Sequence, residues 1–248
     1  MYLRSISYRI LLLAILASAF DGCVAIKDIK YTMQGTRLDL SRQGLNEIPE
    51  EVFLRTDIKV LRLFGNSIES ISPRIAELEN LEELFIGRNE LRSLPPEIGQ
   101  LKNLRVLYVE NNRLESLPEE LGHLESLEEL RLSQNQLVSL PESIGRLNNL
   151  VVLRVNYNSL ESIPASIGNC SNLGFLHLKR NNMVELPSTI TNLNRLKELY
   201  LTGAGPLLQV PEEMCDLRYM ELIVIDNTIA LPACMYVLQA NRLRIVQH

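Results

Sequence analysis

Tryptophan is absent from this 248-residue chain, and aromatic residues together make up only 5% of it. Hydrophobic residues nevertheless reach 46%, so the chain can bury a continuous core, and that core must be aliphatic. Stacked leucine and isoleucine side chains form such a core, which favours a stacked structure. The formal net charge of −5 argues against an undirected polyanion binder, and no nucleic-acid partner is expected.

Cysteine and histidine are also scarce, with four and three residues. Their spacing resembles no zinc site and no Cys–His nucleophile, and neither a phosphate-binding glycine loop nor a catalytic triad is present. We therefore expect no metal, no cofactor and no enzymatic activity. Cys215 and Cys234 lie in adjacent terminal turns and could form a disulfide in an oxidising compartment. Cys170 falls where neighbouring repeats have leucine, which indicates a buried apolar residue.

Long apolar runs are missing from the chain after residue 25, where charges recur every few residues and leave no transmembrane segment. Residues 1–25 have the layout of a secretory signal peptide, with two early arginines, the apolar run 10–19 and then small residues. That run is too short to span a bilayer of about 30 Å. Cleavage after Ala19 or Ala25 would give a secreted or cell-surface protein. A lipid anchor at Cys23 and a buried N-terminal helix are the alternatives.

The dominant feature of the sequence is a repeat of 23 residues that reads LxxLxLxxNxLxxLPxxIxxLxx. The spacing holds without a gap along one series of leucines: Leu81, Leu104, Leu127, Leu150, Leu173 and Leu196. Ile58 extends the series upstream, and Gly35 begins one more, divergent unit. The register slips by one residue within 203–206, and a shortened unit begins near Met220. Such strict self-similarity predicts a solenoid of stacked units.

Each repeated position has a physical role in such a stack. Leu130 and Leu132 alternate with outward residues, so each unit contributes one strand to a parallel sheet. The proline that follows the next inward residue suits the first turn of a short helical segment. One asparagine per unit can satisfy backbone groups where the chain turns out of the strand. We expect these asparagines to form a structural ladder: Asn66, Asn89, Asn112, Asn135, Asn158 and Asn181.

These motifs resemble those of the leucine-rich-repeat superfamily over about residues 35–231. They are most similar to its 23-residue class with the LPxxIxxLxx tail, found in Ras-suppressor-like scaffold proteins and in many bacterial and protist proteins. The resemblance implies an α/β solenoid with a curved parallel sheet on the concave face and short helical or 3-10 segments on the convex face. Most members of that class are intracellular, so the signal peptide here argues against a Ras-pathway role.

The ends of a solenoid expose core and sheet edges and therefore need caps. The chain accordingly divides into a signal peptide (1–25), an N-terminal cap (26–34), about eight or nine repeats (35–231) and a C-terminal cap (232–248). Apolar residues at roughly helical spacing predict a capping helix over residues 232–245. Asn169, in the sequence Asn-Cys-Ser, matches a glycosylation sequon that only a eukaryotic secretory pathway would use.

Binding is expected on the outward residues of the strands, because the concave surface of such solenoids commonly binds. Their central column consists of Arg62, Phe85, Tyr108, Arg131, Arg154, His177 and Tyr200. Neighbouring positions add Phe64, Arg88, Tyr157, Phe175, Lys179 and Arg180. These columns hold six Lys or Arg residues against four Glu, so the face is more positive than the acidic chain as a whole.

Aromatic residues and arginine are enriched at the cores and hot spots of protein interfaces. We therefore expect a monomeric protein that binds a protein ligand on this face, and an acidic patch on the ligand would complement the charge. The simplest alternative is that exposed strands favour aromatic and β-branched residues in any case. Two other functions also remain: a structural protein that self-associates through its concave face, and capture of a glycan or lipid ligand.

Overall fold

The computed structural model describes residues 32–205, 210–239 and 242–248. The expected signal peptide, Cys23 and most of the expected N-terminal cap lie outside these residues. Among the helices that the structure describes, none is both long enough and apolar enough to cross a membrane.

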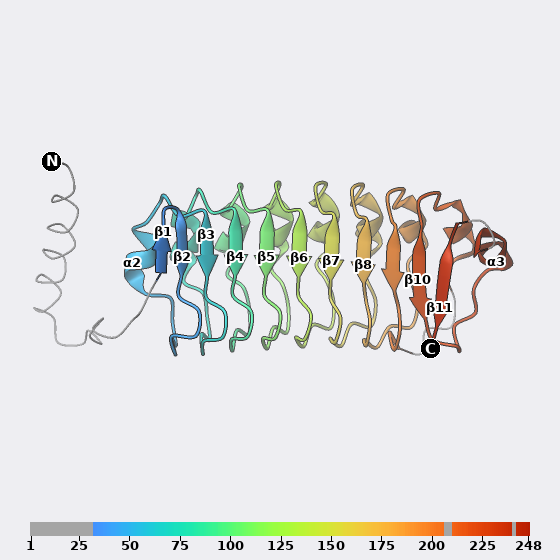
Figure 1. The fold of residues 1–248 in the computed structure, drawn as a ribbon, viewed down its shortest axis with the longest axis horizontal. Helices are drawn as coiled ribbons and strands as arrows, with labels where there is room; N and C mark the ends of the chain where they lie inside the picture. Colours follow the sequence, from blue (N-terminus) through green and yellow to red (C-terminus); the bar gives the residue numbers. More distant parts are fainter. Residues whose placement is uncertain (1–31, 206–209, 240–241) are drawn as a thin grey trace, which may run out of the picture. The chain divides into compact units, whose positions relative to one another are not determined.

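One sheet of eleven strands follows the order of the sequence (Figure 1). The strands are β1 (Thr32–Gln34), β2 (Arg37–Asp39), β3 (Val60–Arg62), β4 (Glu83–Phe85), β5 (Val106–Tyr108), β6 (Glu129–Arg131), β7 (Val152–Arg154), β8 (Phe175–His177), β9 (Glu198–Tyr200), β10 (Leu222–Ile225) and β11 (Arg244–Gln247). The β1–β2 pair is antiparallel, and every later pair is parallel. Tyr200 pairs with Val224, which lies 24 instead of 23 residues further on, so the register slip falls between β9 and β10.

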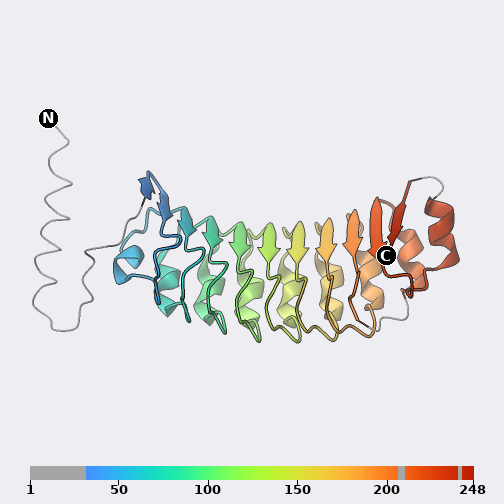
Figure 2. The same cartoon turned by 60° about the horizontal axis from the view of Figure 1, so that its bottom comes forward.

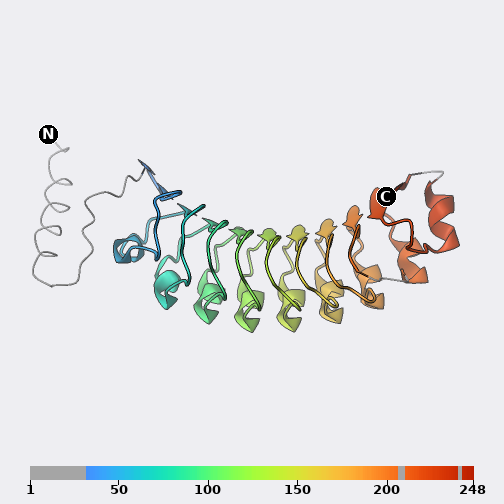
Figure 3. The same ribbon diagram turned by 90° about the horizontal axis from the view of Figure 1, so that it is seen from below.

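Short helices lie together on one side of this sheet (Figure 2). They are α2 (Glu50–Phe53) and the 3-10 helices η3 (Pro73–Glu77), η4 (Pro96–Gln100), η5 (Glu119–His123), η6 (Glu142–Arg146), η7 (Ala165–Asn169), η8 (Ser188–Asn192) and η9 (Glu212–Asp216), with α3 (Ala233–Gln239) near the end. Within the repeats, the strands follow the inner side of the arc and the helices the outer side (Figure 3). The predicted curved parallel sheet with short 3-10 segments opposite it is confirmed.

The inward leucines of the repeat form the core between the sheet and the helices. Leu127, Leu130 and Leu132 have no exposed surface, and burial of such a side chain contributes about 1.5–3 kcal/mol. Cys170 is equally buried, and its Sγ lies 3.2 Å from the carbonyl oxygen of Ile144. Burial raises the pKa of this thiol to about 12, so it stays protonated and acts as a core residue.

Glycine is required on the convex side, where the helices of successive repeats pack closely. A Cβ atom on Gly122 would lie 2.4 Å from the carbonyl oxygen of Ser143, and one on Gly145 would lie 2.4 Å from that of Ser166. Both distances are far below van der Waals contact. The glycines therefore set how closely consecutive repeats approach on this side.

The C-terminal end differs from the helix expected over residues 232–245. Helix α3 ends at Gln239, and the chain then returns to the sheet as β11, parallel to β10. The β-branched pair Ile245 and Val246 explains the difference, because such residues favour a pleated surface over a helix. A disulfide between Cys215 and Cys234, with Cα atoms 6.0 Å apart, joins η9 to α3.

Candidate binding face

The concave face consists of the outward side chains of β2–β10 and of the residues that directly follow these strands. Parallel pairing aligns the central column in consecutive strands: Arg62, Phe85, Tyr108, Arg131, Arg154, His177 and Tyr200. None of these seven residues is buried. Neighbouring strands lie about 4.8 Å apart, so the segment from Tyr108 to Tyr200 spans roughly 19 Å.

Rings and guanidinium groups stack along this column. Phe85 and Tyr108 meet edge to face with ring centroids 4.9 Å apart, and His177 and Tyr200 lie 4.3 Å apart in a tilted arrangement. The guanidinium carbon of Arg131 lies 4.1 Å from the centroid of the Tyr108 ring. Each ring is thus held by a neighbour, and such a preordered surface loses little side-chain entropy when it binds a ligand.

Two glutamates of the adjacent column hold the hydroxyl groups. Tyr108 donates a hydrogen bond of 2.7 Å to Glu129, and Tyr200 donates one of 3.1 Å to Glu198. Arg131 also forms an ion pair with Glu129, at 2.7 Å. Burial, and then the bond to Glu129, raise the pKa of the Tyr108 hydroxyl to about 12. Glu129 therefore balances the charge of Arg131 within the face.

Arg154 differs from its neighbour Arg131 in the partners of its guanidinium group. Its Nε atom is buried and has no hydrogen-bond partner among the described residues. Within the same part of the chain, no carboxylate forms an ion pair with its guanidinium group. A buried donor left unpaired costs about 1–3 kcal/mol. This difference is not visible in the repeat pattern, where both residues are outward arginines.

His177 lies beside Arg154 in the column and stacks on Tyr200. Burial, followed by the positive charges of Arg154 and Arg131, lowers the pKa of His177 to about 4. The imidazole is therefore neutral at neutral pH and adds no charge to the centre of the face. Arg154, which forms no ion pair with a carboxylate of the described residues, supplies positive charge there.

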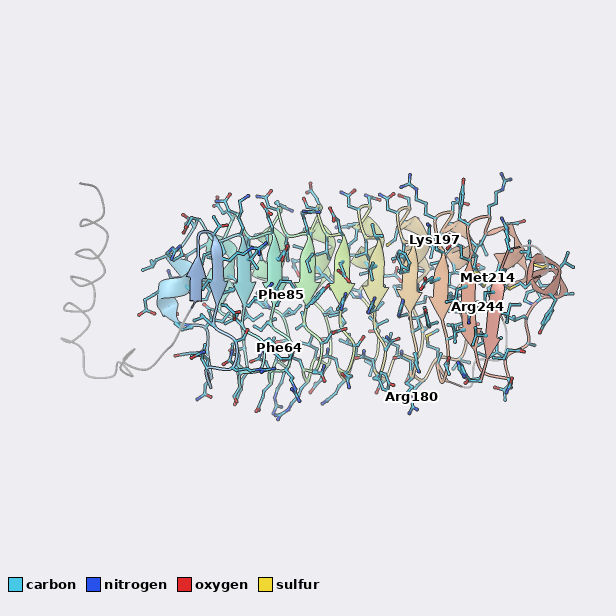
Figure 4. The ribbon with its side chains drawn as sticks, in the orientation of Figure 1. Phe64, Phe85, Arg180, Lys197, Met214 and Arg244 are labelled. Atoms are coloured by element: carbon cyan, nitrogen blue, oxygen red, sulfur yellow. A yellow bond between two sulfur atoms is a disulfide. The ribbon has the colours of Figure 1, made fainter. Side chains whose placement is uncertain are left out.

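Three of the predicted binding residues lie just beyond the strands, at the rim of the face. Arg88, Tyr157 and Arg180 have left-handed backbone conformations, with φ of 59°, 55° and 52°. This turn was not predicted, although Gly65 and Gly203 at the same repeat position were a signal for it. The Arg180 guanidinium carbon lies 5.5 Å from the centroid of the Tyr157 ring, and Figure 4 shows Arg180 at the edge where the strands end.

The remaining predicted residues flank the central column. Phe64 is the second residue after β3, and its ring centroid lies 5.8 Å from the guanidinium carbon of Arg42 (Figure 4). Lys179 follows β8, where its backbone N–H donates to the side-chain oxygen of Asn156 at 2.9 Å. Phe175 pairs with Val152 and Glu198 in the adjacent column. The structure thus aligns the seven central residues and distributes the others around them.

The asparagine column supports the turn behind this rim. Asn135 donates to the carbonyl groups of Leu132 (2.9 Å) and Val109 (3.0 Å) and accepts from the N–H of Leu114 (3.0 Å). Its side chain therefore links two successive repeats. Equivalent bonds are made by Asn66, Asn89, Asn112, Asn158 and Asn181. Because these amides are bonded to the backbone, they are structural and do not contribute to the binding surface.

Solved structures similar to this chain include bacterial and plant proteins. A leucine-rich-repeat protein of Leptospira interrogans is 32% identical with a TM-score of 0.79, over 87% of this chain and 61% of that one. The Arabidopsis thaliana receptor-kinase ectodomain GASSHO1/SCHENGEN3, solved with CASPARIAN STRIP INTEGRITY FACTOR 2, is 32% identical with a TM-score of 0.71, over 84% and 26%. The plant peptide hormone receptor RGFR1, solved with RGF2, is 27% identical with a TM-score of 0.69, over 81% and 33%.

The chain thus spans 61% of the Leptospira protein and smaller parts of the plant receptors. No curated protein matches it. A family model described as a leucine-rich repeat region matches residues 38–131 and 96–174, more than half of the chain. This match and the fold confirm the resemblance seen in the repeats: the chain belongs to the leucine-rich-repeat superfamily.

Proposed function

We propose that this protein is a recognition module that binds an acidic segment of another protein across its concave face. The observation that carries the proposal is that Arg154, at the centre of a stacked column, forms no ion pair with a carboxylate of the described residues, unlike Arg131. A guanidinium group recognises a carboxylate with two parallel hydrogen bonds, which gives direction as well as energy. Tyr108 on one side and Tyr200 on the other would supply the large contact area that interface hot spots require.

The similar structures support recognition in general. The Arabidopsis ectodomain and the plant hormone receptor were each solved with a second named molecule, and RGFR1 is itself described as a peptide hormone receptor. The family and its fold usually serve as binding scaffolds without enzymatic activity. Recognition on the concave face is consistent with both facts and requires no catalytic group.

Selection from a random peptide library displayed against the full chain tests this function. We expect the selected peptides to be enriched in Asp and Glu, and we expect Arg154→Gln to weaken their binding at least tenfold. Exposed Arg146 on the convex side is the matched control, so Arg146→Gln should leave their affinity unchanged. Peptides without acidic enrichment, or equal effects of the two variants, would contradict the proposal.

Secretion or surface exposure through the secretory pathway is part of the same proposal. It is based on the two early arginines, the apolar run and the small residues of segment 1–25. The disulfide between Cys215 and Cys234 agrees with an oxidising compartment. Asn169 is exposed at the end of η7, where a glycan would project from the convex side. Mass analysis of the secreted N-terminus should find cleavage after Ala19 or Ala25. An intact Met1 in the cytosolic fraction would contradict secretion.

Self-association through the concave face would occupy the same residues. Light scattering at micromolar concentration separates the two functions, because a binding module with a foreign partner should remain a monomer. A dimer that Arg154→Glu dissociates would instead favour a structural role.

A further inference from the structure

A ladder of ion pairs follows the edge where the strands begin, opposite the rim that carries Arg180. Each pair joins a cation in one repeat to a glutamate in the next: Lys59 with Glu82 at 2.6 Å, Arg105 with Glu128 at 2.8 Å and Lys197 with Glu221 at 3.5 Å. Figure 4 shows Lys197 at this edge. In every pair the partners occupy the same position of successive repeats, so the ladder alternates cation and carboxylate.

Two residues interrupt the ladder. Val151 and Gly174 occupy the positions at which the alternation calls for a cation and a carboxylate, between Glu128 and Lys197. Val151 is an apolar side chain that is 37% exposed, whereas the residues of the ion pairs in this column are charged. An apolar residue and a missing side chain thus replace one ion pair in the middle of the solenoid.

The backbone does not require glycine at position 174. Its φ is not in the left-handed region, and a Cβ atom there would meet only ordinary contacts, 3.6 Å from the carbonyl oxygen of Arg195 and 3.9 Å from a Val151 methyl group. Gly122 on the convex side differs, because a Cβ atom there would lie 2.4 Å from backbone. Glycine at position 174 is therefore not needed for folding.

Val151 and Gly174 both line a hollow of about 410 Å³, within the size range of small-ligand sites. Val151, Gly174 and Phe175 contribute its apolar lining, and Phe175 also belongs to the concave face. Among the polar lining residues are Glu128, Asn149, Asn172, Arg195 and Lys197. The hollow is therefore continuous with the concave face.

The charges around the hollow favour an anionic ligand group. Arg105 binds Glu128 through two hydrogen bonds, of 2.9 and 2.8 Å, which neutralise the carboxylate. Arg195 donates to the neutral amide of Asn172 at 2.6 Å, so no carboxylate offsets its charge in that contact. Lys197 is paired with Glu221 only at 3.5 Å, beyond the usual length of a charged hydrogen bond.

We propose that this hollow is a second binding subsite, which takes an apolar side chain of the ligand together with an adjacent carboxylate. The apolar side chain contacts Val151 and Phe175, and the carboxylate lies toward Arg195 and Lys197. This subsite rests on the proposed function, since it would bind part of the acidic protein segment on the concave face. It adds a specificity element: an apolar residue next to an acidic one in that segment.

N-acetyl-phenylalanine with a free carboxylate is the probe, titrated into the ¹⁵N-labelled full chain and followed by NMR. We expect saturable shifts at the amides of Val151, Gly174 and Lys197, with a dissociation constant on the order of a millimolar for a ligand of this size. The neutral amide of the same compound, and N-acetyl-aspartate without the ring, should each bind at least threefold more weakly. Equal binding of all three compounds, or no saturable shift at these residues, overturns the proposal.

The matched variant is Val151→Lys with Gly174→Glu, which would complete the ladder and fill the hollow. We expect it to keep the thermal midpoint and to abolish the shifts; unchanged binding overturns the proposal. Val151→Ser alone serves if the double variant does not fold, and it should weaken binding at least threefold. Arg146→Gln on the convex side should leave the probe's affinity within twofold. The selected peptides and the Arg154→Gln variant test the proposed function, whereas the probe and the variants of Val151 and Gly174 test the subsite. Failure of one can therefore be distinguished from failure of the other.

Discussion

The side chain of Asn135 is 8% exposed and bonds three backbone groups in two successive repeats. Asn135→Ala would leave these groups unpaired in a buried turn, so the free energy of unfolding should fall by about 1–3 kcal/mol. Urea denaturation measures the change. The exposed neighbour Gln136 is the control, and Gln136→Ala should have almost no effect. If both variants lost the same stability, the ladder would not stabilise this turn.

His177 links stability to pH. Its pKa is about 4 in the folded protein and 6.5 as the ordinary value, so between these values the unfolded state binds more protons. Its neutral form therefore stabilises the folded protein above pH 6.5, and stability falls as pH drops toward 4. Between pH 7 and pH 5, the free energy of unfolding of the wild type should fall by about 1 kcal/mol more than that of His177→Gln, after allowance for solvent screening. Equal losses in urea denaturation would contradict the assigned pKa.

The positions of the binding residues could be predicted at this scale, but their interactions could not. Alternation along each strand identifies Arg131 and Arg154 as outward residues. Whether a carboxylate balances them depends on side-chain geometry, and Glu129 reaches one guanidinium group but not the other. A simple count of charges on the face therefore missed the residue that is most informative about the ligand.

Among the elements, the convex helices depend on glycine at one position. Gly122→Ala would force a Cβ atom against the backbone of Ser143, so it should lower the free energy of unfolding by about 1–3 kcal/mol. Gly174→Ala has room for the methyl group and should be neutral or slightly stabilising. Thermal or urea unfolding of the two variants provides the comparison. A similar cost at both positions would mean that close helix packing is not what requires Gly122.

The disulfide between η9 and α3 closes a loop with a sequence separation of 19 residues. In the chain-entropy description, a cross-link of this length stabilises the folded state by about 3 kcal/mol. Cys215→Ser with Cys234→Ser should therefore lower the unfolding free energy by that order. Amide exchange should accelerate first in α3 and β11, because the link attaches this cap. Uniform acceleration through the central repeats would contradict a local role.

Strands and convex segments were predictable because each repeats the same pattern, so errors in one unit are corrected by the others. The C-terminal cap occurs once and offered no such check. A single apolar pattern there covered both α3 and β11, and only the β-branched pair Ile245 and Val246 separates the helix from the strand. The left-handed turn at Tyr157 was missed because most repeats have a non-glycine residue there.

For the whole molecule, the repeat specifies the scaffold while its variable residues form the proposed binding face. Parallel pairing converts a spacing of 23 residues into one line of side chains, so distant residues such as Phe85 and Tyr200 belong to one surface. That arrangement was predictable from the sequence. The hollow lined by Val151 and Gly174 was not, because its shape depends on side-chain geometry that the repeat pattern does not specify.

The central claim is that the concave face, and not the helical side, binds the protein ligand. Its most direct test is isothermal titration of a library-selected acidic peptide against Tyr108→Ala combined with Arg154→Glu. Loss of a hot spot costs about 2 kcal/mol or more, so affinity should fall at least 30-fold while the thermal midpoint stays within a few degrees. Glu142→Ala, which changes an exposed side chain of η6 on the convex side, should bind like the wild type. Wild-type affinity in the concave variant, with loss in the convex one, would contradict the account and place binding on the outer helices.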